Sequence, residues 1–515
     1  MSDDLLDFLD NLDDVSAGDS SGNTQSTDDS GIDGDMLLED DPLTGSSDGT
    51  QFEQENINGA GTMDVSGHFQ KILDIAAIDE EKKRILSGAI SRLKIAADFS
   101  ALDEPGKKAL KDVNTIYTEA FKNISLRAAS GKLTLDQNIR TFLLYGFLSE
   151  VFAGQNLKSF LPGDDSLLEN NINIMPLAKW LKLLYKNEEY PSISELGVDF
   201  QKFIRERERT ASAKQKADLD AMTEEDKANE RVVYELSNMV RAVSRLIVPS
   251  GAHSPLFLAE SSNANPAGSL VTAKKIKTIV NEIKFYDYSI FYRETLYKLS
   301  TTTNEFVQVE AEPYFIILPI AGDKVFFWQE FSSNKKNSRA RIMLPVFFTG
   351  DLRKALISAL AKYRWELCRS IKGNLWTDPV EGGLTGAFYD YITCYKKNPK
   401  LSFEAKEKIE DVIKMKRKDF KRIFELYYIY WIEFERKGIM KLDKAAREIL
   451  FKFCPFNKDI NKILEKLPGY KDLVNRHKNI SLKTIERLEA KYSKKRDEQG
   501  NLPPELQSNI SFYSM

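Results

Sequence analysis

The residue types that most often do chemistry are sparse in this chain. Its 515 residues include three histidines and three cysteines, all far apart in the sequence. They are His68, His253, His477, Cys368, Cys394 and Cys454. No two stand at CxxC or HExxH spacing, so the sequence predicts no metal site, no bound cofactor and no Ser-His-Asp machinery. His253 lies beside Ser250 and Ser254, but a lone loop histidine is usually solvated.

Paired carboxylates are the remaining route to acid–base chemistry, and Asp378 and Glu381 are the candidates. They lie in a loop at 376–386 that contains two consecutive glycines and precedes a helix expected at 384–396. The alternative is an ordinary helix start, because glycine is common in connections and no GxxxxGK[ST] or GxGxxG pattern is present. The catalytic residues are therefore unknown, and an enzyme whose type the sequence does not identify stays an open alternative.

Two acidic-hydrophobic islands interrupt the polar N-terminal segment 1–65, which is expected to be a disordered acidic tail. The apolar residues expected to dock are Leu5, Phe8, Leu9, Leu12, Met36, Leu37 and Leu38. Leu5, Leu9 and Leu12 fall on one helical face, which is typical of a segment that folds into a groove of a partner protein. The alternatives are a solubilising tail and a tail that covers a basic face of its own chain.

Charge is unevenly distributed along the chain. Residues 1–70 contain 18 Asp and Glu and no Lys or Arg, so residues 71–515 carry 73 basic against 59 acidic residues. Most of this excess falls in 391–500, with 29 basic and 17 acidic residues. The sequence therefore indicates a basic region that could meet a polyanion.

Basic residues with interleaved aromatics could bind nucleic acid through phosphate contacts and stacking. The candidates are Lys335, Lys336, Arg339, Lys416, Arg417, Lys418, Lys421 and Arg422. The alternative is a solvated lysine-rich face over a helical core, because the aromatics of the same segment repeat at core spacing. Those aromatics are Phe420, Phe424, Tyr427, Trp431 and Phe434.

The stretch 306–376 is the element around which the rest is expected to fold. Four short β-branched or aromatic runs predict an antiparallel meander, with strands at 306–310, 314–320, 324–331 and 340–348. Pro319 and Pro345 lack the N–H of a ladder, so at least one strand should be an edge or carry a bulge. A helix should then run from an Asp351 cap to Gly373, with its aromatics in the core. Apolar periodicity also predicts helices over 271–298, over 402–437 with Ser402 as the cap, and over 481–494.

The fold class that follows is mainly α with a small central antiparallel β-sheet (α+β) and helical N- and C-terminal regions. Seven parts are expected along the chain. They are the acidic tail 1–65, a helical bundle 66–195, a long charged helix or spacer 196–248, a loop linker 249–269, an α+β domain 270–375, a basic helical region 376–500 and a tail 501–515. Two heptads at 232–246 are too few to predict a coiled coil, which favours one helix face docked on its own domain.

Widely spaced cysteines and an acidic N-terminus indicate a cytoplasmic protein, and the apolar runs are too short for a membrane span. The leading function hypothesis is an interaction or scaffold protein that docks a partner through the N-terminal segment. The alternatives are a nucleic-acid-binding protein that uses the basic C-terminal region and an enzyme of another type. The sequence leaves the oligomeric state open.

Overall fold

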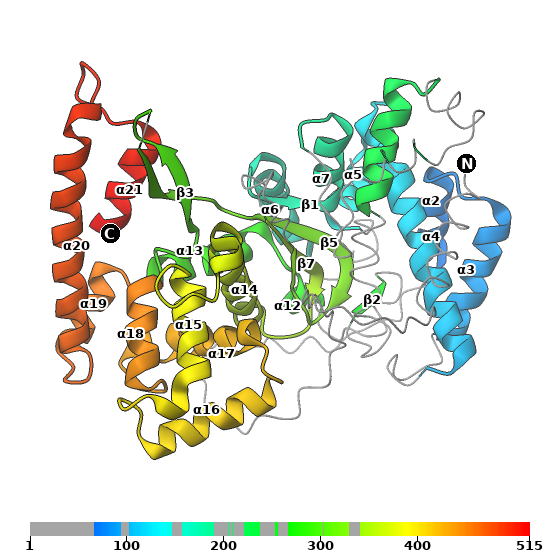
Figure 1. Cartoon of the computed structure of the whole chain (residues 1–515). Coiled ribbons are helices and arrows are strands. Elements are labelled where there is room, and N and C mark those ends of the chain that lie inside the picture. The colour runs from blue at the N-terminus through cyan, green and yellow to red at the C-terminus, as the bar shows by residue number, and fades with distance from the viewer. Residues whose placement is uncertain are drawn as a thin grey trace. The chain divides into compact units, whose positions relative to one another are not determined.

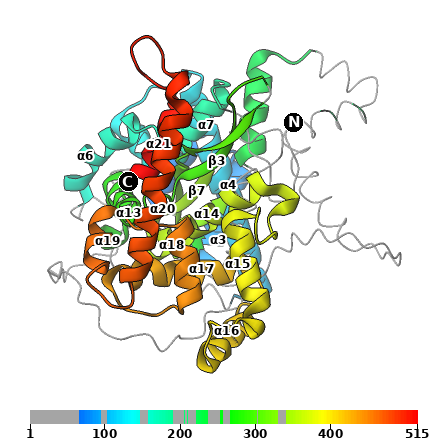
Figure 2. The same cartoon turned by 60° about the vertical axis from the view of Figure 1, so that its left-hand side comes forward.

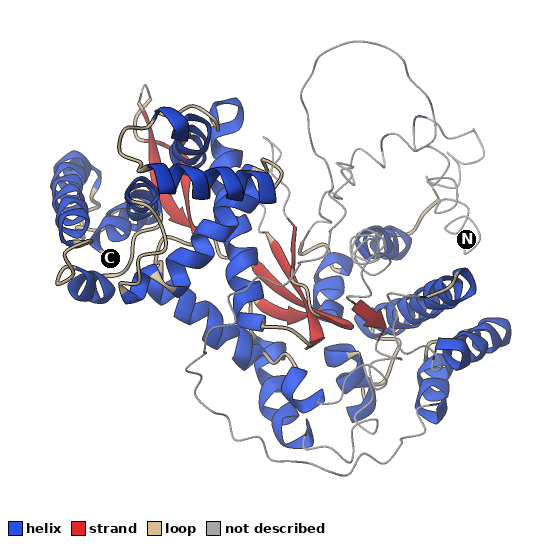
Figure 3. Cartoon of the chain, turned by 90° about the horizontal axis from the view of Figure 1, so that it is seen from below, coloured by secondary structure: helices blue, strands red, loops and turns tan. Residues whose placement is uncertain are grey.

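The structure is a computed structural model of the whole chain. It describes residues 66–93, 102–146, 157–189, 221–236, 253–255, 266–301, 303–328 and 340–515, and the single positions 205 and 209. Helices dominate these residues, with one mixed sheet and one two-stranded antiparallel sheet (Figure 3). The predicted mainly helical fold with a small antiparallel sheet is confirmed.

The N-terminal helical region contains six helices and one strand within its described residues. They are α2 (Ser66–Ile75), α3 (Glu80–Leu93), α4 (Glu104–Ala129), α5 (Gln137–Tyr145), α6 (Leu157–Asn170), β1 (Ile174–Pro176) and α7 (Leu177–Tyr185). Helix α4 begins where the Asp103 side chain accepts the Gly106 N–H, and it packs against α3 and α7 (Figure 1). Strand β1 joins the central sheet, so this region shares one hydrophobic core with the α+β part.

The central sheet has the order β1-β5-β7-β6, with β2 (His253–Pro255) also paired to β5. Strands β5 (Tyr314–Gly322) and β7 (Arg341–Phe348) run parallel, while β6 (Phe326–Trp328) runs antiparallel to β7. The predicted antiparallel meander is therefore wrong in its pairing. Nearly every residue of β5 and β7 is buried, which suits parallel strands covered on both faces.

A bulge interrupts the pairing of β5 with β7. The register shifts between Leu318 and Ala321, a stretch that contains Pro319. This confirms the expectation that a proline-containing strand would be bulged, because proline cannot donate to the ladder.

The antiparallel sheet is a hairpin of β3 (Tyr292–Lys298) and β4 (Asn304–Glu310). The helix expected over 271–298 ends earlier, as α13 (Ala273–Tyr286). Val307 of the hairpin is fully buried in a second, smaller core, together with Leu488 and Leu506. Leu506 belongs to helix α21 (Pro504–Ser514), so the predicted tail 501–515 is wrong: burial of an apolar face holds this segment as a helix.

Helix α14 (Leu352–Lys372) has the predicted limits. The Asp351 side chain accepts the Lys354 N–H at its start, and Gly373 follows its last residue with a positive φ of 52°. Trp365 of this helix is buried and contacts the rings of Phe388 and Phe424 edge-on or tilted. The aromatics of this helix thus lie in the core, as expected.

The C-terminal region consists of helices that pack on α14 and on one another. They are α15 (Gly383–Cys394), α16 (Phe403–Met415), α17 (Phe420–Glu433), α18 (Lys444–Phe453), α19 (Lys458–Leu464), α20 (Lys471–Tyr492) and α21. The helix that the sequence predicts over 402–437 is broken. Arg417 and Lys418 adopt left-handed φ values of 51° and 62°, and Asp419 then caps α17 by accepting the Arg422 N–H.

The segments between the N-terminal region and α13 are described in part. Residues 224–236 are helical, and Val232 and Leu236 lie in the main core. For these residues, one helix face is docked on its own domain, as predicted. The expected linker 249–269 contains β2 and the short helix α12 (Pro266–Ser269).

A buried polar cluster ties the C-terminal region to the rest. Arg364 of α14 is 7% exposed and donates to the carbonyl oxygens of Tyr292 and Phe453, the latter at 2.8 Å. Asp287 is fully buried, accepts the Tyr428 hydroxyl at 2.7 Å and lies in the field of the Arg364 cation. Burial raises the pKa of Asp287, while the nearby Arg364 cation and the hydrogen bonds from Ser289 and Tyr428 oppose this rise by stabilising the ionised carboxylate.

We expect Arg364→Met to lower the free energy of unfolding by about 3–5 kcal/mol, because it removes two charge-assisted hydrogen bonds to buried carbonyl oxygens, each worth about 1.5–3 kcal/mol. Arg369→Met is the control on the same helix. Arg369 is about half exposed and pairs with Glu366 at 3.8 Å, so its loss should cost roughly 1 kcal/mol or less. Urea unfolding of both variants provides the comparison, and equal effects would contradict the anchoring role of Arg364.

Candidate functional site

Several residues singled out from the sequence lie outside the described residues. These are the docking candidates Leu5, Phe8, Leu9, Leu12, Met36, Leu37 and Leu38, and the basic candidates Lys335, Lys336 and Arg339. The remaining candidates belong to the described C-terminal region.

The carboxylate candidates Asp378 and Glu381 lie at the start of α15. One carboxylate oxygen of Asp378 accepts the N–H groups of Val380 and Glu381, each at 2.8 Å, and these bonds lower its pKa. A Cβ at Gly386 would stand 1.9 Å from the Asp378 carbonyl oxygen, so only glycine permits this approach. These contacts assign Asp378 to the turn, the ordinary helix start that the sequence left as an alternative.

The other basic candidates gather at the turn between α16 and α17. Arg417 and Lys418 are exposed there, and Lys416 is half-buried. Lys421 lies 3.2 Å from Glu366, and Arg422 lies 3.5 Å from Asp419. The structure therefore brings all five candidates to one turn, where Lys421 and Arg422 form ion pairs within the protein.

A longer basic surface lies on α20, where the sequence predicted a helix only over 481–494. Four exposed cationic residues follow one face of this helix and the short 3₁₀ turn that continues it. They are Arg476, Lys483, Arg487 and Lys494, which we call the α20 row. Their spacings of seven, four and seven residues match one helical face. The uninterrupted run without glycine or proline from 470 to 499 was the signal that could have revealed the row.

Two separate cores hold α20 in place. Leu473 and Val474 at its start belong to the main core, while Leu488 and Tyr492 at its end belong to the hairpin core. Figure 1 shows α20 beside α18, α19 and α21, and Figure 2 shows α21 running next to it. The helix is thus fixed at both ends, with its middle exposed on one side.

Most aromatic rings of the basic region lie inside the protein. Phe424 and Trp431 are fully buried and Tyr427 is 6% exposed. The core alternative is therefore confirmed for these three rings, which are not accessible to stack on nucleotide bases, while Phe420 and Phe434 are half-buried. Phe403, at the start of α16, is an exception because it is 77% exposed.

A second polar cluster joins α5, α6 and α13. The hydroxyl of Tyr145 lies 2.9 Å from a carboxylate oxygen of Asp164 and 2.8 Å from one of Asp165. The other oxygen of Asp164 accepts the Ala273 N–H at 2.7 Å, at the start of α13. A phenol has one proton, so the second carboxyl contact requires a proton on a carboxyl group. We assign that proton to Asp165, because Asp164 already accepts a backbone N–H.

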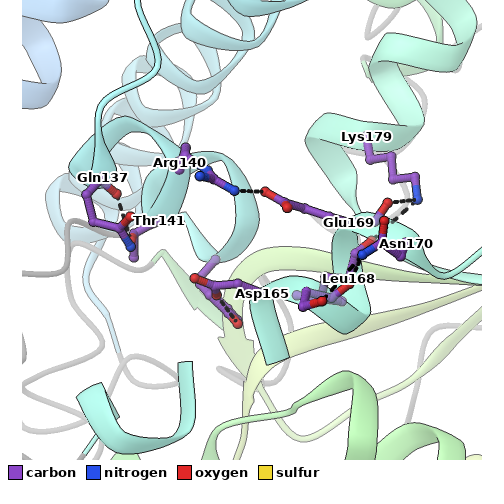
Figure 4. Close-up of polar contacts among 10 residues, drawn as sticks. Gln137, Arg140, Thr141, Asp165, Leu168, Glu169, Asn170 and Lys179 are labelled. Carbon is purple, nitrogen blue, oxygen red and sulfur yellow. Dashed lines mark hydrogen bonds and ion pairs between the residues drawn. The ribbon is translucent and has the colours of Figure 1, made fainter. Parts of the chain in front are cut away.

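Neighbouring charges surround this cluster. Burial is the main cause of the raised pKa of both Asp164 and Asp165, and Glu169 adds to it at Asp165 while Arg140 opposes it. Arg140 pairs with Glu169 at 2.5 Å (Figure 4). On the α13 side, Lys275 faces Asp164. The cluster has the chemistry of a proton-binding structural contact between helices.

Lys179 of α7 holds the C-terminal end of α6. Its ammonium donates to the carbonyl oxygens of Glu169 and Asn171 at 2.7 and 2.8 Å (Figure 4). A cation at a helix C-terminus satisfies carbonyls that have no partner within the helix. Polar contacts therefore secure α6 at its middle, through Asp164 and Asp165, and at its C-terminal end.

The described residues contain neither a metal-binding group nor a membrane-spanning helix. No group of three or more His, Cys, Asp and Glu side chains in that part of the chain could hold a metal ion. Among the same residues, no helix combines the length and the apolar character needed to cross a membrane.

We expect the contribution of Asp165 to the stability of the protein to fall as pH rises above about 4, because a carboxyl with a raised native pKa binds its proton more tightly in the folded than in the unfolded state. The contribution is fully present below the unfolded pKa and is lost as pH rises through the folded pKa. Asp165→Asn replaces that proton with a permanent amide donor. This variant should exceed the wild type in stability at pH 7, and the difference should shrink towards pH 4.

Urea unfolding of both proteins from pH 4 to pH 8 measures this difference. Ser166→Ala serves as a control, because Ser166 is exposed on the same helix. A difference between Asp165→Asn and wild type that is constant with pH would contradict the proton assignment.

Comparison with known proteins adds one match. Residues 373–513 match the model of a family described as a domain of unknown function (DUF8509). No curated protein and no solved structure matches the chain. The matched segment begins at the glycine that ends α14 and contains both the α16–α17 turn and α20.

Proposed function

We propose that this protein binds nucleic acid through its basic C-terminal region. The observation that carries this proposal is that cationic side chains lie on the surface of this region while most of its aromatic side chains lie in the core. Arg417 and Lys418 of the α16–α17 turn and the four cations of the α20 row are exposed, while most of the aromatic side chains between them are buried. Such a surface would contact phosphates and would make no sequence-specific contacts to the bases.

The buried polar clusters support a binding role over catalysis. Asp287, Arg364 and Tyr428 are each less than a tenth exposed and bond to one another or to backbone atoms. Asp378 caps a turn, and Asp164 holds the start of α13. Each of these groups has a structural partner that accounts for its position.

We expect the full-length chain to bind a fluorescent 20-base-pair duplex of mixed sequence, with an affinity that falls steeply with salt. Each phosphate neutralised by a lysine or arginine contributes a slope of about −0.9 in a plot of log K against log salt concentration. Anisotropy titrations between 50 and 300 mM NaCl measure that slope. A chain that stays unbound at 50 mM NaCl would overturn the proposal.

A second candidate function rests on the N-terminal segment. Its leucines at helical spacing among aspartates favour a segment that docks a partner protein as an interaction or scaffold protein would. We expect Leu5→Glu with Leu9→Glu to lose at least one protein that the wild type captures from native lysate. Thr24→Glu with Ser26→Glu is the control, because it adds equal charge to the same segment without removing apolar side chains. Identical captured proteins for all three chains would sink this candidate.

A further inference from the structure

We propose that α20 is the element that binds, and that its ligand is the phosphate backbone of a duplex, contacted without regard to sequence. This inference rests on the proposed nucleic-acid binding and names the element and the ligand. The contacts would be made by the α20 row, Arg476, Lys483, Arg487 and Lys494.

The α20 row is straight and long. Its first and last members are eighteen residues apart, which corresponds to about 27 Å at 1.5 Å per residue. Between the ends of the row, the exposed acidic residues Glu486 and Glu489 lie about 80° and 140° away around the helix at roughly 100° per residue, and the exposed Asp472 precedes Arg476 by one turn. The row therefore presents an uninterrupted line of positive charge.

A duplex matches this line in charge and length. It carries one negative charge per about 1.7 Å of its axis, so about 27 Å of duplex presents roughly 16 phosphates on its two strands. Four cations fixed on one rigid helix could reach phosphates along such a length without ordering a flexible segment first. Because both ends of α20 are packed in hydrophobic cores, the row is preorganised for this contact.

The lack of exposed aromatic rings on α20 favours a duplex over a single strand as the ligand. Tyr492 is fully buried and its hydroxyl accepts a hydrogen bond from the Asn509 amide, while His477 is half-buried near Phe451. The exposed apolar residues near the row are aliphatic, Ile480 and Leu482. Single-strand binding depends on stacking of bases on aromatic rings, which this surface does not offer.

Existing ion pairs leave the α20 row available. Arg476 lies 3.6 Å from Glu448, but its side chain is 59% exposed, so this surface pair is weak and can be exchanged for a phosphate. Lys491, next to the row, lies 3.0 Å from Glu305 of the hairpin, which is mostly buried. That second pair secures α20 on the hairpin and is not counted in the row.

The experiment compares two double variants of the full-length chain that differ only in the face of α20 they change. Lys483→Ala with Arg487→Ala removes two members of the row. Lys471→Ala with Lys478→Ala removes two exposed lysines from another face of the same helix. Both variants lose two positive charges, and alanine keeps helix propensity high. Circular dichroism and thermal unfolding verify that both remain folded.

We expect the row variant to reduce the salt-dependence slope on a 20-base-pair duplex by about 1.8, which is about 60-fold in affinity at 0.1 M salt. The control variant should retain the slope of the wild type to within about 0.5, less than one full phosphate contact. The wild type should also prefer the duplex to a single strand of the same sequence, and polyglutamate at equal charge should not displace the duplex.

Four results would overturn the inference while the proposed function stands. The first is an equal loss in both α20 variants, which would show a dependence on net charge alone. The second is a loss confined to Lys416→Ala with Arg417→Ala and Lys418→Ala at the α16–α17 turn. The third is tighter binding of the single strand. The fourth is displacement by polyglutamate, which would indicate an acidic protein as the ligand. Absence of binding by the wild type would instead remove both proposals.

Discussion

The buried guanidinium of Arg364 is the interaction on which the arrangement of this chain depends. It donates to backbone carbonyls at the start of the hairpin and at the end of α18, and it faces the buried Asp287. A charge this deeply buried is costly unless it is paired and hydrogen-bonded, so these segments must meet at one place. Helix α14 thereby fixes the C-terminal helices to the hairpin and to the end of α13.

The Arg364 cluster positions helix α20 indirectly, through the hairpin of β3 and β4. The hairpin leaves the buried cluster at Tyr292 and forms a small core with α20 and α21, closed by Val307 and Leu506. The Asn509 side chain adds polar bonds, accepting the Gln308 N–H and donating to the Tyr492 hydroxyl. Since the start of α20 packs in the main core, two independent contacts define its direction and the surface it exposes.

Capping residues in the sequence correctly predicted the helix limits, because those limits depend on contacts between residues close together in the chain. The limits of α14 follow from Asp351 and Gly373, and Ser402 caps α16 as its position in the sequence indicates. Pairing of β1 with β5 joins residues about 140 positions apart, so no short pattern could reveal the parallel sheet. The break at Arg417 and Lys418 places two non-glycine residues at positive φ, which residue propensities disfavour. The α20 row was missed because the predicted helix began ten residues late and excluded Arg476.

Lysine footprinting with and without a 20-base-pair duplex tests the central claim most directly, because it reads the contact surface of the unaltered protein. Brief acetylation followed by mass spectrometry gives the reactivity of each lysine. We expect the duplex to protect Lys483 and Lys494 severalfold and to leave Lys471 and Lys478 as reactive as in the free protein. Protection confined to lysines outside α20, with Lys483 and Lys494 unchanged in the bound state, would contradict the account.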